Sequence, residues 1–179
     1  MEKNQRVEVT KRMLREGLLR LLETKDPDKI SITELCRESG VNRSTFYRYY
    51  SLPKDILTEM QDLFIEEMYN DFKGSFTVCD VERMFGYFLE NKEIVKIFLR
   101  YNSDLDWIDL FNHFYGSFIS KNALKAFHGL DEESSRLLFS YIAGGTSLVI
   151  RQWIMEDIPK SPKEIAEIIL NFVDKEKSF

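Results

Sequence analysis

Apolar residues recur along most of this chain at intervals of three or four positions, the repeat of an α-helix with one buried face. The first such run covers residues 5–24, where Leu14, Leu18, Leu21 and Leu22 fall on one face. The alternation of apolar and polar residues that marks a β-strand is absent, and the few glycines (8) and prolines (4) leave long segments unbroken. The pattern therefore predicts an all-α fold.

Helix start and stop signals divide the segment after this first helix into two short helices. Ser31 is followed three residues later by Glu34, the spacing of a capping box, and Gly40 stands where a helix ends in the left-handed conformation. Asn42 is a typical N-cap for the next helix, expected over residues 43–50. Two short helices joined by a tight turn, after a longer first helix, predict a helix-turn-helix unit that covers residues 31–50.

The remaining apolar runs predict a larger helical part. A long helix is expected over residues 53–73, and the shorter runs after it predict further helices at about 80–90, 92–101, 104–127, 132–155 and 163–176. We expect residues 1–55 to form the helix-turn-helix domain and residues 56–179 a second helical domain, with helix 53–73 as the connector.

The stretch GVNRSTFYRYY, residues 40–50, combines four aromatic residues with two arginines. Phe46 and Tyr50 are four positions apart and, with Val41, are expected to pack inward. Hydroxyls and amides near a helix N-terminus suit phosphate oxygens, and arginine can reach base edges. The candidate DNA-binding residues are Thr33, Asn42, Arg43, Ser44, Thr45, Tyr47, Arg48, Tyr49 and Lys54. An exposed aromatic surface also fits a protein–protein patch, so the spacing alone leaves both open.

The longer segment ISITELCRESGVNRSTFYRYYSLPKDIL resembles the DNA-binding signature of the TetR/AcrR family of transcriptional regulators. The residues in register are Ile30, Ile32, Leu35, Gly40, Val41, Thr45, Phe46, Tyr47, Tyr50, Lys54, Asp55 and Leu57. The resemblance implies a regulator that binds a palindromic double-stranded DNA operator as a homodimer, under the control of a small ligand. Tyr49 and Ser44 depart from the commoner family residues, which leaves the operator sequence open.

Near the C-terminus, YIAGGTSLVIRQWIMEDIPKSPKEIAEII resembles the subgroup of regulators similar to the dihydroxyacetone kinase operon activator. Helix 132–155 has two apolar faces, one of them with Leu137, Tyr141, Gly144 and Leu148, which indicates burial on two sides. We expect a two-fold four-helix dimer interface. Its candidate residues are Leu138, Ile142, Gly145, Val149, Trp153, Ile165, Ile168, Ile169 and Phe172. The alternative is that both faces are intrachain core.

An aromatic-rich region between these parts is the candidate pocket for a small apolar effector. Its residues, with one from helix 132–155, are Phe85, Phe88, Phe98, Tyr101, Trp107, Phe111, Phe114, Tyr115, Phe118 and Tyr141. Plain core packing at helical spacing is the alternative. His113 and His128 lie far apart and are expected to be ordinary surface or capped histidines.

Charge and composition narrow the class of protein. Residues 1–55 carry 12 Lys and Arg against 9 Asp and Glu, a net charge of +3, whereas the rest of the chain carries −8 of the total of −5. This asymmetry indicates that the first third alone faces a polyanion. Cys36 and Cys79 are expected to be small buried hydrophobes rather than a disulfide.

Other kinds of function find no support in the sequence. No metal-ligand spacing, phosphate-binding loop or catalytic constellation is present, so we expect no cofactor, no metal and no enzyme activity. Long apolar runs and an N-terminal apolar segment are absent, so we expect no membrane partner and a cytoplasmic location. The rival hypothesis is a TetR-fold coactivator that acts mainly through a protein partner.

Overall fold

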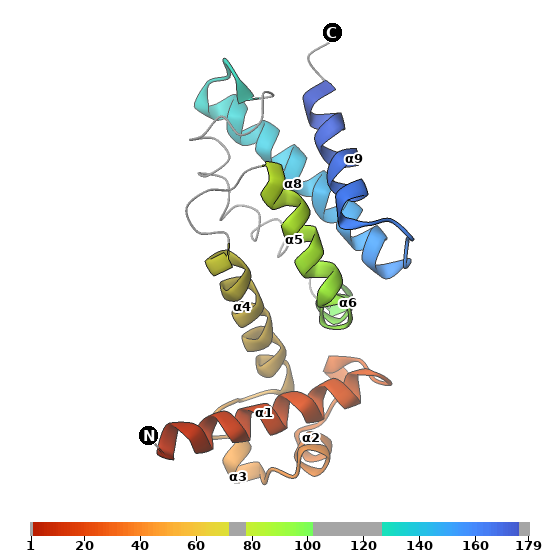
Figure 1. Cartoon of the computed structure of the whole chain (residues 1–179). Helices are drawn as coiled ribbons and strands as arrows, with labels where there is room; N and C mark the ends of the chain where they lie inside the picture. Colours follow the sequence, from red (N-terminus) through yellow and green to blue (C-terminus); the bar gives the residue numbers. More distant parts are fainter. Residues whose placement is uncertain (1, 72–77, 102–126, 176–179) are drawn as a thin grey trace. The chain divides into compact units, whose positions relative to one another are not determined.

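The fold is all-α, as predicted. The computed structural model describes residues 2–71, 78–101 and 127–175, and this part of the chain contains helices and no strand. The chain forms two compact units, Met1–Glu66 and Glu67–Phe179. Figure 1 labels the helices of both units, and each unit is described by itself below.

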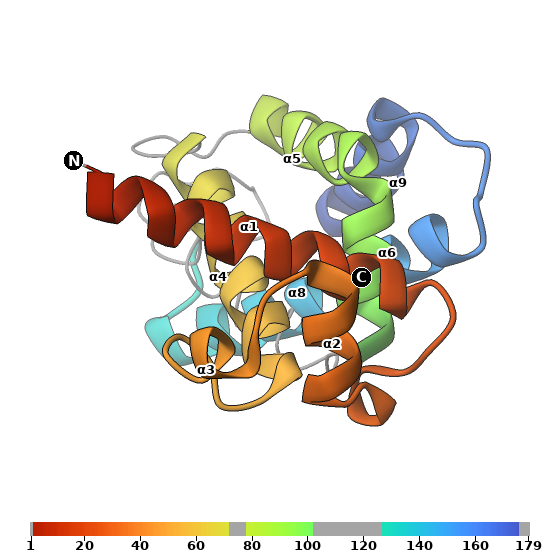
Figure 2. The same ribbon diagram turned by 90° about the horizontal axis from the view of Figure 1, so that it is seen from below.

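The first unit is built on helix α1, Glu2–Leu22. A 3-10 turn η1, Pro27–Lys29, leads into α2, Ile32–Ser39, and then α3, Arg43–Phe46. Helix α1 packs against α2, which contacts α3, and Figure 2 shows α1 lying across both short helices. The apolar face predicted on α1 is the buried one, with Leu14, Leu18 and Leu22 at 2% exposure or less.

The predicted boundaries of the two short helices are confirmed except at the end of the second. The Ser31 hydroxyl accepts from the Glu34 backbone N–H (3.2 Å) and the Glu34 carboxylate accepts from the Ser31 N–H (3.2 Å), which completes the capping box. Gly40 is left-handed, with φ of 70°. Regular helix ends at Phe46 rather than at residue 50, and residues 47–49 form tighter turns.

Helix α4, Pro53–Asp71, passes from the first unit into the second. Its first turn is fixed locally, because the Asp55 carboxylate accepts from the backbone N–H groups of Ser51 (2.8 Å) and Leu52 (2.7 Å). The start of α4 then contributes Ile56 and Leu57 to the buried core. The first unit therefore extends to Glu66, beyond the predicted boundary at residue 55.

The second unit contains α5, Val78–Glu90, α6, Lys92–Tyr101, α8, Glu132–Met155, and α9, Pro162–Lys175. Helix α5 packs on α9 and α6 on α8. Residues 102–126 are outside the described residues, so almost all of the helix expected at 104–127 lies there. The buried core of the described part includes Met84, Phe85, Phe88, Val95, Phe98, Leu99, Phe139, Ala143, Ile150, Trp153, Ile154 and Ile165.

Polar contacts connect helix α6 to α8 and to the turn that follows it. Lys92 and Lys96 both form ion pairs with Asp157, and the Arg151 guanidinium donates to the backbone carbonyl of Leu99. Hydrogen bonds from the two lysines lower the pKa of Asp157 to about 2, so its carboxylate is ionised at neutral pH. These contacts lie at both ends of α6 and restrain it against α8.

The cysteine prediction is half wrong. Cys36 is buried but Cys79 is exposed, because Cys79 lies in the first turn of α5 away from the core positions Val81 and Met84. Both are free thiols. Within the described ranges, no group of Cys, His, Asp and Glu is arranged to hold a metal ion, and no helix is both long and apolar enough to cross a membrane.

Helix α1 and the end of α2 approach so closely that Gly17 leaves no room for a side chain. A Cβ atom at this position would lie 2.8 Å from Cβ of Ser39 and 3.0 Å from its Cα. We expect Gly17→Ala to lower the free energy of unfolding of the first unit by about 1–3 kcal/mol, because the two helices must move apart. Denaturant unfolding followed by far-UV circular dichroism measures this change.

The matched control is Gly86→Ala in α5, where a Cβ atom would meet nothing within 4 Å. There we expect a gain of about 0.5–1 kcal/mol from the lower backbone entropy of the unfolded chain. If Gly17→Ala is as stable as the wild type, the close approach of α1 and α2 is wrong.

Candidate nucleic-acid interface

The reading segment, residues 43–50, begins at a well-formed helix cap. The Asn42 side-chain oxygen accepts from the backbone N–H of Thr45 (2.8 Å) and from the Ser44 hydroxyl (2.8 Å). This cap satisfies one of the N–H groups that a helix start leaves without a partner. The cap residue predicted from sequence is therefore confirmed, and it fixes the start of the exposed face.

One side of the reading segment is anchored in the core of the first unit. Phe46 is fully buried, and Val41 (6% exposed) and Tyr50 (7%) are buried beside it. The Phe46 and Tyr50 rings lie 6.0 Å apart between centroids. Because this side is fixed, Tyr47 and Arg48, which follow Phe46 in the turn, face outward.

Most of the predicted DNA-binding residues are exposed to solvent. They lie in or directly before the reading segment, except Thr33 in α2 and Lys54 in α4. Thr33, Asn42, Arg43, Ser44, Tyr47, Arg48 and Lys54 are exposed, and Thr45 and Tyr49 are half-buried. Within the described part of the chain, Arg43, Arg48 and Lys54 form no ion pair with a carboxylate, so their charges are not neutralised internally. An array of free cations and hydroxyls on one face can contact phosphates and base edges.

Arg43 and Tyr47 contact each other on this exposed face. An Arg43 guanidinium nitrogen donates to the Tyr47 hydroxyl (3.4 Å), and the guanidinium carbon lies 6.0 Å from the centre of the Tyr47 ring. The hydrogen bond to Tyr47 raises the pKa of Arg43. The contact orients the arginine while 54% of Tyr47 stays accessible.

A polar cluster behind this face was missed in the sequence. It joins Glu59 of α4 to Lys11 and Arg15 of α1 and to Tyr50 at the end of the reading segment. The sequence predicted Tyr50 only as a core ring, and Glu59 only as one carboxylate on a long helix. Residues 48 positions apart, such as Lys11 and Glu59, share no local pattern, so no signal in a single sequence pairs them.

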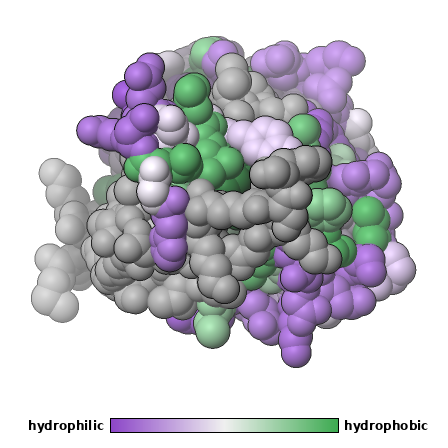
Figure 3. All heavy atoms as spheres, turned by 90° about the horizontal axis from the view of Figure 1, so that it is seen from above, coloured by the Kyte–Doolittle hydropathy of each residue, from purple (hydrophilic) through white to green (hydrophobic). Residues whose placement is uncertain are grey.

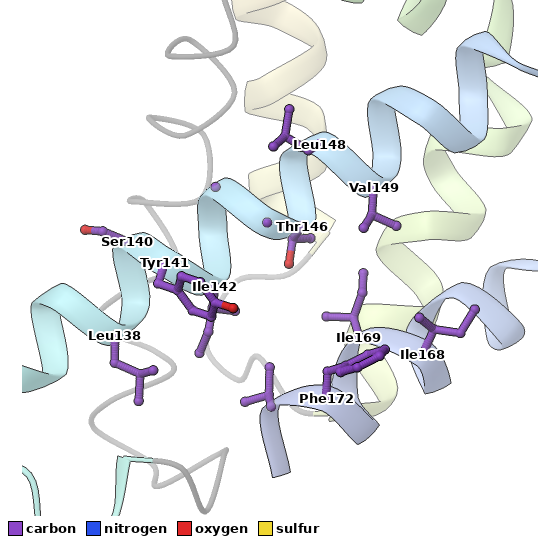
Figure 4. A pocket seen from close by; sticks show the side chains of 13 residues that line it. Leu138, Ser140, Tyr141, Ile142, Thr146, Leu148, Val149, Ile168, Ile169 and Phe172 are labelled. Carbon is purple, nitrogen blue, oxygen red and sulfur yellow. The ribbon is translucent and has the colours of Figure 1, made fainter. Parts of the chain in front are cut away.

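A second candidate site is an apolar groove between α8 and α9 in the second unit. Its lining includes Leu138, Ile142, Val149, Ile169, Phe172 and Val173, together with Gly144 and Gly145. Figure 4 shows Val149 and Ile169 pointing toward one another across the groove, whereas Leu148 points away from it. Apolar side chains, green in Figure 3, reach the surface among hydrophilic ones.

The exposure of this groove is unusual for so apolar a set of side chains. Tyr141 is 69% exposed and Phe172 72%, and outside the groove Leu137 is 69% exposed. The core face of α8 is a third one, formed by Phe139, Ala143, Ile150 and Ile154. Within the described residues, both predicted apolar faces of α8 are at least partly exposed, apart from Trp153.

Two residues predicted for the dimer interface are corrected by the structure. Trp153 is 2% exposed, because its indole N–H donates to the backbone carbonyl of Lys160 (2.9 Å) and its ring meets Phe85 edge to face at 6.3 Å. Ile165 is 4% exposed and belongs to the same interior. The period of the apolar pattern placed Trp153 on the outer face, but the turn after α8 covers it.

The predicted effector pocket divides into three parts. Phe85, Phe88 and Phe98 are fully buried core residues, and Tyr101 is half-buried. Tyr141 does not join them, because it lies on the exposed side of α8, which corrects its assignment to the pocket. Trp107, Phe111, Phe114, Tyr115 and Phe118, like His113, lie outside the described residues. His128 is exposed, as expected of a surface histidine.

The fold is similar to solved structures of transcriptional regulators. A TetR transcriptional regulator from Streptococcus agalactiae 2603V is 15% identical with a TM-score of 0.71, over 98% of this chain and 99% of that one. The dihydroxyacetone kinase operon activator DhaS is 16% identical with a TM-score of 0.68, over 92% and 93%. The regulator FadR from Bacillus subtilis, in complex with stearoyl-CoA, is 18% identical with a TM-score of 0.60, over 91% and 97%.

Comparison of the sequence with protein families finds a match within the second unit. No curated protein matches the chain. A family model described as the transcriptional regulator C-terminal region (TetR_C_8) matches residues 80–175, more than half of the chain. These residues include α8 and α9 and the groove between them. With its helix-turn-helix unit and this C-terminal region, the chain belongs to the TetR family of transcriptional regulators.

Proposed function

We propose that this protein is a sequence-specific DNA-binding regulator that binds a palindromic operator as a homodimer. The observation that carries the proposal is the reading segment, in which Phe46 is fully buried while Arg43 and Arg48 are exposed; the exposed Lys54 follows in the first turn of α4. Phosphate contacts from such a face position the protein, and the arginines supply base readout. Two copies would enter successive major grooves about 34–36 Å apart.

The homodimer part of the proposal is supported by the α8/α9 groove. Its exposed apolar side chains, with Phe172 at 72% and Tyr141 at 69% exposure, are costly to leave in water. A second copy related by a two-fold axis would present the same apolar face and cover both at once. Gly144 and Gly145, which have open space at their Cβ positions, would admit side chains of the partner.

Modulation by a small apolar effector remains part of the proposal. Because Phe85, Phe88 and Phe98 are core residues, its support is that FadR, a structural neighbour, is bound to stearoyl-CoA. An effector can change DNA binding only if it has different affinities for two arrangements of the protein. Since a regulator must share a compartment with its DNA, the expected cytoplasmic location is kept. No enzyme activity is proposed.

The rival function is a coactivator that acts through a protein partner. In that case the exposed aromatic side chains of the reading segment would contact the partner protein instead of DNA. The internally unpaired cations of the reading face favour DNA, because a protein patch gains more from apolar and aromatic anchors than from three cations. A gel-shift assay with DNA upstream of the protein's own gene separates the two functions.

Two variants should distinguish phosphate contacts, which depend on charge alone, from contacts that read bases. We expect Lys54→Ala to weaken binding to all duplexes alike and to lower the salt slope by about 1, because one phosphate contact is lost. We expect Arg43→Ala to relax preference at particular base pairs, at a cost of about 1–3 kcal/mol. Fluorescence anisotropy titrations on operator and scrambled duplexes at several salt concentrations measure both effects.

The control for these variants is Lys163→Ala, which removes an exposed cation from α9 of the second unit and should leave the salt slope unchanged. If Arg43→Ala binds the operator as tightly and as selectively as the wild type, this face does not read DNA and the coactivator function leads.

The dimer should depend on the groove residue Phe172. Phe172→Glu would bury an unpaired carboxylate in each protomer, at a cost of several kcal/mol, and should dissociate the dimer into 21.2 kDa monomers. The monomer should remain folded, because Phe172 is 72% exposed within the chain. Sedimentation equilibrium at micromolar concentration reports the mass of each species.

Asn171→Glu adds the same charge to an adjacent exposed position of α9 that does not line the groove, and it should leave the dimer intact. A wild-type protein that sediments as a stable monomer would remove the homodimer from the proposal.

A further inference from the structure

The Glu59 carboxylate is shared by three structural elements of the first unit. One oxygen accepts from the Lys11 ammonium of α1, and the other accepts from the Tyr50 hydroxyl at the end of the reading segment. A guanidinium nitrogen of Arg15 lies 4.0 Å from the second oxygen. Glu59 itself belongs to α4. A single charge therefore connects α1, the reading segment and α4.

This cluster is partly withdrawn from water. The side chains of Lys11, Arg15 and Glu59 are 22%, 25% and 28% exposed, and Tyr50 as a whole residue is 7% exposed. Solvent screens such contacts less than it screens an exposed ion pair, so each contact restrains the elements it joins. The Lys11 ammonium also lies 5.6 Å from the centre of the Tyr50 ring, which holds the ring from a second direction.

The protonation states suit this role. Burial raises the pKa of Glu59, but hydrogen bonds from Lys11 and Tyr50 and the charges of Lys11 and Arg15 outweigh burial, so the pKa is lowered overall. The pKa of Tyr50 is raised, mainly by burial and to a lesser extent by the hydrogen bond to Glu59. At neutral pH the carboxylate is charged and the phenol keeps the proton that it donates.

The cluster acts on the reading segment from behind. Phe46 anchors the segment by apolar packing, and Tyr50, one turn later, is tied through its hydroxyl to α4 and through Glu59 to α1. Apolar packing tolerates small rotations of a helical turn, whereas a directed hydrogen bond at its far end does not. Rotation of this turn would move Arg43 and Tyr47 relative to bound DNA.

We propose that Glu59 is a positioning residue for operator recognition: its charge holds the end of the reading segment in the orientation that reads bases. The inference rests on the proposed DNA-binding function and deepens it. Glu59 sets the preference for the operator over other DNA, and it does so through Tyr50, Lys11 and Arg15 without touching DNA itself.

The direction in which Glu59→Gln changes operator affinity distinguishes a positioning role from a purely electrostatic one. Glu59→Gln removes a negative charge from a unit that faces a polyanion, so electrostatics alone predicts tighter binding to every duplex. The glutamine amide can still accept from Tyr50 but cannot neutralise Lys11 and Arg15. A positioning role predicts the reverse for the operator, because fewer molecules hold the reading orientation and apparent affinity falls with that fraction.

The experiment uses the full-length protein and two duplexes of equal length, one selected by the wild type from a random pool and one scrambled. We expect Glu59→Gln to bind the selected duplex about tenfold more weakly, since one charged hydrogen-bond network is lost. Binding to the scrambled duplex should be unchanged or tighter. The control, Glu66→Gln, makes the same charge change at an exposed position of α4 and should not weaken binding to the selected duplex.

Tyr50→Phe is the second variant, because it removes only the hydroxyl and leaves the ring in the core. It should reproduce the loss of preference without changing the salt slope. The double variant should lose no more than either single variant, since Glu59→Gln weakens the contacts of Glu59 with α1, Tyr50→Phe removes its contact with the reading segment, and either change interrupts the same path. Far-UV circular dichroism and melting temperature verify folding at the assay temperature, so a loss of folded protein is not mistaken for a loss of preference.

The possible outcomes separate the inference from the proposed function. If the wild type selects no duplex and binds selected and scrambled DNA alike, the proposed function fails and the inference fails with it. If the wild type prefers its duplex and both Glu59→Gln and Tyr50→Phe keep that preference, the inference alone is overturned. A fall in preference for both variants, with Glu66→Gln unaffected, supports it.

Discussion

Burial of the Phe46 ring is the contact on which the arrangement of the reading segment depends. The ring is fully buried and packs beside Tyr50, so the short helix has only one orientation in which its aromatic anchors leave water. A phenylalanine side chain gains about 1.5–3 kcal/mol on burial, and reversing the helix would forfeit this and expose the core. Every polar residue on the other side, from Arg43 to Arg48, owes its accessibility to that one anchor.

Apolar burial decides which face points outward but does not hold a short helix to a fixed angle. Regular helix covers only Arg43–Phe46, too short to be rigid by its own hydrogen bonds. The Asn42 cap restrains its start, and the Tyr50–Glu59 contact restrains its end. Packing and directed polar contacts thus have separate roles in this unit: the first selects the face and the second limits its rotation.

The same physics gives a different result in helix α8. One face of this helix packs on its own unit through Phe139, Ala143 and Ile150, and a second apolar face borders the groove with α9. The chain offers no described element that covers Tyr141 or Phe172. An apolar face exposed in this way is a surface that a second copy can cover, and this is why a two-fold partner belongs to the proposed function.

The sequence by itself determined what local interactions decide: the all-α fold, the Ser31–Glu34 capping box, the left-handed Gly40 and the Asn42 cap, since each depends on neighbours within a few residues. It also separated the faces of the reading segment, because helical period alone assigns them. Tertiary structure decided the rest. Trp153 is core rather than interface because the turn up to Lys160 covers it, and Tyr141 is surface because α8 rotates it away from the buried phenylalanines. The contact of Glu59 with Lys11 and Tyr50 exists only when α1, α4 and the end of the reading segment meet, and no local pattern in the sequence encodes that meeting.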